Sequence, residues 1–114
     1  MKETPLEKYC NDLADLSLKW YEDQVQRKYY LRDIYNQLVR SATSIGANLA
    51  EAKFAQSDAD YKSKISIALK EANETRYWIQ RLVVNKSIDS LTESKFSELI
   101  EQILNILISI RKKM

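Results

Sequence analysis

Apolar residues recur every three to four positions along most of the chain, and short polar stretches interrupt them. This spacing predicts amphipathic α-helices, because an α-helix turns once in about 3.6 residues. Thr4, Pro5 and Glu7 form a helix start, with Thr4 as the N-cap and Glu7 completing a capping box. Ser57, followed by acidic residues, is a second start. The pattern predicts four helices near residues 5–24, 30–54, 58–84 and 92–112.

The links between these stretches are short. The apolar period falters between Trp20 and Leu31 without a Gly or Pro, and this places the first break. Leu91 and Phe96 bracket Thr92 in the manner of a hydrophobic staple at the start of the last helix. We therefore expect residues 1–114 to form one all-α domain, an antiparallel up-down four-helix bundle.

The second and third helices each carry a polar row beside the apolar stripe. An apolar stripe is enough to explain a helix in a bundle, so these rows need another partner. One reading is an ion-pair and hydrogen-bond network within the chain, with Arg40 facing Glu71 or Glu74. The other is an interface between copies of the chain, where Trp78 is either an anchor or an intrachain contact. The candidate residues of this network or interface are Arg40, Ser44, Asn48, Glu51, Glu71, Glu74 and Trp78.

Two segments of these helices resemble a known family. Residues 40–52 read Arg-Ser-Ala-Thr-Ser-Ile-Gly-Ala-Asn-Leu-Ala-Glu-Ala, similar to the signature of bacterial four-helix-bundle proteins encoded by intervening sequences of 23S ribosomal RNA genes. Residues 68–78, Ala-Leu-Lys-Glu-Ala-Asn-Glu-Thr-Arg-Tyr-Trp, resemble the family's third helix. The chain departs at Ala52, where the family usually has Gly, and at Ala55, where an Arg often follows. The resemblance implies a ring of five identical subunits and leaves the biochemical role undefined.

The composition argues against catalysis. The chain has no His and a single Cys, and no Gly-rich phosphate loop is present. Cys10 falls on an apolar stripe, so we expect a buried thiol. A carboxylate-only metal site at Glu51, Glu71 and Glu74 is less favoured than the ion-pair network, because hard cations require more oxygen ligands. We expect no enzymatic activity, no cofactor, no metal and no small-molecule substrate.

The charge distribution leaves nucleic-acid binding open. The net charge is only +2, but residues 25–56 hold five positive and two negative side chains. Cations and tyrosines alternate near the start of the second helix, a mixture suited to phosphates and bases, or else a solvated helix end with tyrosines packed partly into the bundle. A distant similarity to the accessory proteins of diversity-generating retroelements implies RNA binding through a basic surface. The candidate contacts are Arg27, Lys28, Tyr29, Tyr30, Arg32, Arg111, Lys112 and Lys113.

The chain begins without an apolar leader and has no run of about 18 apolar residues, so we expect a cytoplasmic protein without a membrane segment. The sequence therefore predicts a self-assembling, non-enzymatic scaffold whose main partner is itself. The alternative is an accessory protein that binds RNA or DNA through a basic surface of the ring.

Overall fold

Four α-helices account for most of residues 2–114, which the computed structural model describes. No strand occurs within this range, so the all-α prediction with four helices is confirmed. The capping box at Thr4 and the N-cap at Ser57 are also confirmed. The helices are α1 (Pro5–Arg27), α2 (Arg32–Lys53), α3 (Asp58–Val84) and α4 (Ser90–Lys112), with a 3₁₀ turn η1 (Tyr29–Leu31) between α1 and α2.

Four helix boundaries differ from those predicted, by one to three residues: the end of α1, both ends of α2 and the start of α4. The helix α1 continues to Arg27, because its polar last turn contains no residue that breaks a helix. The backbone leaves the helical region only at Lys28, with φ −135° and ψ 65°, and η1 follows. The helix α4 starts at Ser90, since the Asp89 side chain accepts a hydrogen bond from the backbone N–H of Thr92. The predicted staple is wrong, because Leu91 is 67% exposed.

The core is a single apolar cluster to which all four helices contribute. An aromatic group joins three of them: the Trp20 ring meets Tyr35 edge to face at 5.0 Å between centroids and Phe96 at 6.1 Å. Phe96 is fully buried, and edge-to-face pairs add to the free energy gained from apolar burial. Cys10 is also buried, as predicted.

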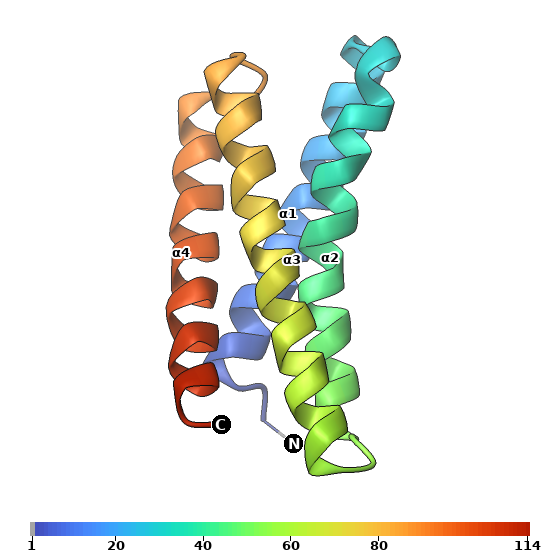
Figure 1. The fold of residues 1–114 in the computed structure, drawn as a ribbon. Helices are drawn as coiled ribbons and strands as arrows, with labels where there is room; N and C mark the ends of the chain where they lie inside the picture. Colours follow the sequence, from blue (N-terminus) through green and yellow to red (C-terminus); the bar gives the residue numbers. More distant parts are fainter. Residues whose placement is uncertain (1) are drawn as a thin grey trace.

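Each helix contacts two neighbours: α1 lies against α2 and α4, and α3 lies against α2 and α4. Figure 1 shows the start of α1, the end of α4 and the α2–α3 link together at one end of the molecule, called here the terminal end. The opposite end, called the far end, holds η1 and the α3–α4 link. The molecule is about twice as long as it is wide, at 45 × 25 × 21 Å. None of the helices in residues 2–114 is long and apolar enough to cross a membrane.

Candidate functional site

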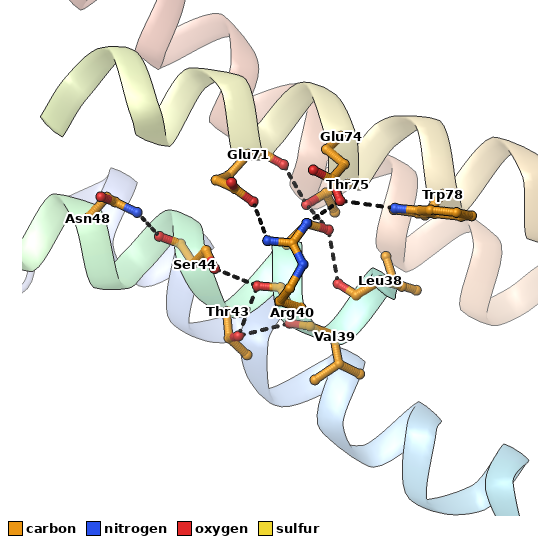
Figure 2. A network of polar contacts seen from close by, with 11 residues as sticks. Leu38, Val39, Arg40, Thr43, Ser44, Asn48, Glu71, Glu74, Thr75 and Trp78 are labelled. Carbon is orange, nitrogen blue, oxygen red and sulfur yellow. Dashed lines mark hydrogen bonds and ion pairs between the residues drawn. The ribbon is translucent and has the colours of Figure 1, made fainter. Parts of the chain in front are cut away.

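The centre of the polar row is Arg40, which joins α2 to α3 by pairing with two carboxylates (Figure 2). Its Nη1 donates to Glu71 Oε2 at 3.2 Å, and its Nη2 pairs with Glu74 Oε2. The sequence predicted a pair with one of the two glutamates, whereas the guanidinium reaches both. Glu71 and Glu74 lie one helical turn apart, so a planar fork between them can bond each.

The network combines buried and exposed groups. The Glu71 side chain is only 10% exposed, the Glu74 side chain is 33% exposed, and that of Arg40 is 45% exposed. Burial acts to raise the pKa of Glu74, but hydrogen bonds from Arg40 and Trp78 outweigh it and hold that pKa below its usual value. The hydrogen bond to Glu74 in turn raises the pKa of Arg40. Arg40 and Glu74 are therefore both charged at neutral pH. Arg40 is the only ion-pair partner of Glu71 within residues 2–114.

The remaining α2 members of the row do not join this network. Ser44 donates to the carbonyl of Arg40 at 2.6 Å, and Asn48 donates to the carbonyl of Ser44 at 2.8 Å. These bonds stay within one helix, as short polar side chains often do. Glu51 lies 4.0 Å from Lys64 on α3, and its side chain is 61% exposed.

Trp78 links the network to the surface of α3. Its Nε1 donates to Glu74 Oε2 at 3.2 Å, so this carboxylate holds both the guanidinium and the indole (Figure 2). The ring of Tyr77 lies edge to face with that of Trp78, 5.3 Å between centroids, and Tyr77 is 53% exposed. Beside it, the Arg81 guanidinium lies 6.0 Å from the Tyr77 ring centroid. Polar network and aromatic pair thus form one continuous surface, called here the α2–α3 ridge.

A buried contact beneath the ridge was not predicted. The hydroxyls of Thr75 and Ser41 lie 2.9 Å apart, and both residues are fully buried. Each hydroxyl is also within hydrogen-bond distance of a carbonyl on its own helix. The available signal was the position of Thr75 within the apolar stripe of α3, because a hydroxyl buried there requires a partner.

Neither metal binding nor thiol chemistry is supported within residues 2–114. No group of three or more His, Cys, Asp or Glu side chains in this range has an arrangement that holds a metal ion. Both inner glutamates are already paired with Arg40. Burial raises the pKa of the Cys10 thiol to about 12, so the reactive thiolate is scarce at neutral pH.

The predicted basic residues fall into two groups at opposite ends of the molecule. Residues 27–32 surround η1 at the far end, and residues 111–113 close α4 at the terminal end (Figure 1). Tyr29 and Tyr30 are 64% and 77% exposed, so they do not pack into the bundle. The Arg32 guanidinium lies over the Tyr29 ring, 4.4 Å from its centroid. Within one chain, the two basic groups do not form one patch.

The sequence comparison decides the family. Residues 8–109 match the family described as 23S rRNA-intervening sequence protein. The chain belongs to this family. Both segments that resemble it, residues 40–52 and 68–78, lie inside the match. A comparison with curated proteins finds no match.

A solved structure of a protein from the S23 ribosomal protein family shares the fold. It is the crystal structure of a protein of unknown function from Bacteroides thetaiotaomicron VPI-5482, with 39% sequence identity and a TM-score of 0.67. The similarity covers 88% of this chain and 98% of that one. This chain and that protein thus share a fold, and the function has to be argued from the surface.

Proposed function

We propose that this chain is a cytoplasmic, non-enzymatic scaffold protein that assembles with copies of itself, through the α2–α3 ridge, into a ring. The proposed subunit is an antiparallel up-down bundle. Two findings support that topology: each helix contacts its neighbours in the chain, and successive links lie at alternate ends of the molecule (Figure 1). The number of subunits proposed is five, as the family resemblance implies.

The observation that carries the proposal is the exposed aromatic pair on the ridge. Tyr77 is 53% exposed although it is a large aromatic residue, and Trp78 beside it is only partly buried. Tyr, Trp and Arg are the residue types that contribute most at the centres of protein interfaces. Arg40 and Glu74 next to the pair keep part of their charge accessible, so they offer a partner polar contacts around an aromatic centre.

A ridge of this kind suits a head-to-tail contact. In a cyclic ring, each subunit presents one face to the next and receives a different face from the previous one. The ridge occupies α2 and α3, which leaves α1 and α4 to receive it. Such an arrangement gives a function to the second rows of α2 and α3, which a lone bundle does not need.

The test is the molar mass in solution, measured by light scattering at micromolar concentration. The expected mass is about five times the 13.4 kDa of the chain. Tyr77→Asp should lower the mass toward that of one chain, because it places a charge in the proposed interface. Phe54→Asp is the matched control, since Phe54 is an exposed aromatic residue at the end of α2, 79% exposed. A single-chain mass for the unmodified protein would refute assembly, and an equal effect of both substitutions would refute the ridge as its site.

A second function is favoured by the far end: binding of single-stranded RNA or DNA. The exposed rings of Tyr29 and Tyr30 offer faces on which bases stack, and Arg27, Lys28 and Arg32 supply positive charge beside them. A ring repeats this patch in each subunit, so several copies can engage one strand. Binding through several copies raises the overall affinity for the strand, even where each single contact is weak.

The separation of the two basic groups makes this alternative testable. Changing Arg27, Lys28 and Arg32 together to Gln should weaken RNA binding and reduce its salt dependence, by about 0.7 in log–log slope for each lost phosphate contact. The same change at Arg111→Gln, Lys112→Gln and Lys113→Gln removes equal charge from the terminal end. Electrophoretic shifts at two salt concentrations compare the variants. No shift of single-stranded, duplex or hairpin RNA at low salt would refute the nucleic-acid function.

A further inference from the structure

A cleft opens at the far end between the start of α2 and the end of α3. Its volume is about 310 Å³, at the lower end of the range of about 300–1,000 Å³ typical of small-molecule sites. Lys28, Leu31, Ile34 and Tyr35 line it from one side, and Arg81 and Leu82 from α3 line the other. The size favours a small molecule over a segment of a protein chain.

The exposure of Ile34 is the first sign that the cleft is a site. Ile34 continues the apolar stripe of α2 that includes Leu38 and Ile45, both fully buried. Since Ile34 lies four residues before Leu38, it projects from the same face of the helix. It is nevertheless 45% exposed. The cleft therefore leaves a core-facing isoleucine accessible to an apolar group.

The charge of the lining gives the second sign. Lys28 and Arg81 both border the cleft, and no acidic residue lines it. Within residues 2–114, neither cation belongs to any of the ion pairs that the structure contains. Two unpaired cations beside apolar side chains attract an anion that also carries an apolar part.

We propose that the cleft binds a small organic anion, whose apolar body covers Ile34 and whose charged oxygens are neutralised by Lys28 and Arg81. The class is an amphipathic carboxylate or a related monoanion of few non-hydrogen atoms. It is a bound ligand and not a substrate. The inference needs neither assembly through the ridge nor nucleic-acid binding, because Lys28, Ile34 and Arg81 line the cleft within one chain. Lys28 also belongs to the proposed nucleic-acid patch, and Arg81 lies beside Tyr77 on the ridge.

Three probes separate the two parts of the proposed ligand. Octanoate carries both an apolar chain and a carboxylate, 1-octanol carries the chain alone, and inorganic phosphate carries the charge alone. Titration calorimetry of the full chain measures affinity. Methyl NMR of the isoleucines locates the ligand, with Ile108 as internal control because it is similarly exposed, at 42%, on α4.

The expected result is saturable binding of octanoate that shifts the Ile34 methyl signal and leaves that of Ile108 in place. The other two probes should bind at least tenfold more weakly. Lys28→Gln with Arg81→Gln should weaken octanoate binding at least tenfold, since each cation makes a charge-assisted contact. Arg111→Gln with Lys112→Gln removes the same charge from the terminal end and should change the affinity less than twofold.

Five outcomes would overturn the proposal. One is the absence of saturable octanoate binding, and another is an equal shift of Ile34 and Ile108. Equally tight binding of 1-octanol would show that the cations take no part, and equally tight binding of phosphate would show that Ile34 takes no part. Equal losses of octanoate affinity in Lys28→Gln with Arg81→Gln and in Arg111→Gln with Lys112→Gln would show that only the net charge of the protein matters. Circular dichroism of each variant verifies that the helices are intact.

Discussion

Replacing Arg40 by Ala should destabilise the protein far more than its exposure suggests. The substitution removes two charge-assisted hydrogen bonds and leaves Glu71, 10% exposed, without its only ion-pair partner within residues 2–114. Breaking a fully buried pair costs about 3–5 kcal/mol and an exposed pair about 0–1. Because Arg40 itself is 45% exposed, solvent screens part of the interaction. We expect a loss of about 2 kcal/mol of unfolding free energy.

Arg76→Ala is a matched control. The Arg76 side chain is 43% exposed, almost equal to that of Arg40, and pairs with Glu101 on α4 at 3.6 Å. The partner differs, because the Glu101 side chain is 54% exposed. Both substitutions replace Arg by Ala inside a helix, so their propensity terms cancel. Arg76→Ala should cost less than about 1 kcal/mol. The difference between the variants measures the effect of a buried carboxylate.

Urea denaturation followed by circular dichroism gives the free energies, at equal protein concentration because assembly changes apparent stability. Removing the carboxylate charge as well, in Arg40→Ala with Glu71→Gln, should recover about 1 kcal/mol. The reasoning would be refuted by an Arg40→Ala loss no greater than that of Arg76→Ala. The single variants Arg40→Ala and Glu71→Gln and their double variant form a double-mutant cycle. If the two single losses add up to the loss of the double variant within about 0.3 kcal/mol, Arg40 and Glu71 do not interact.

The difference in unfolding free energy between the unmodified protein and Arg40→Ala should depend on pH. The pKa of Glu74 is lowered in the folded protein, so its interaction with Arg40 stabilises the fold above the unfolded pKa of about 4.5. This stability is lost as the pH falls through the folded pKa. The gap between the unmodified protein and Arg40→Ala should therefore narrow below about pH 4.5. An unchanged gap down to pH 3 would contradict the role of Glu74.

Three further substitutions or reactions test the fold. Gly46→Ala should stabilise by about 0.5–1 kcal/mol in urea denaturation, because Gly46 lies inside α2 and an added Cβ meets Cys10 Cβ at an ordinary 3.5 Å; a loss of stability would contradict that spacing. Lys86→Gly should stabilise by up to about 1 kcal/mol, since Lys86 follows α3 with φ 58°, a conformation that favours Gly, and an unchanged midpoint would show no strain there. Cys10 should react with a thiol reagent only in denaturant, because burial raises its pKa to about 12, and rapid reaction of the folded protein would refute its burial.

The sequence by itself determined the helices and their inward faces. Capping at Thr4 and Ser57 and the apolar period of α3 are local signals, and local signals can be read from neighbouring residues. It also placed Arg40, Glu71 and Glu74 on the polar rows of the second and third helices. The row with Arg40 stands out because a long cation among small residues is unusual on a solvated face. Its errors were local ambiguities: the polar turn before Lys28 has no residue that breaks a helix, and Asp89 was overlooked as the N-cap of the last helix.

Only the tertiary structure decided which groups meet across helices. That Arg40 bonds both glutamates while Ser44 and Asn48 bond their own helix depends on the rotation of α2 against α3. The contact of Ser41 with Thr75 depends on the same register. The far-end cleft is likewise invisible in the sequence, where Ile34 appears as one more core residue. Its exposure arises because the start of α2 and the end of α3 leave a cleft between them, and periodicity within one helix carries no information about the distance to the next.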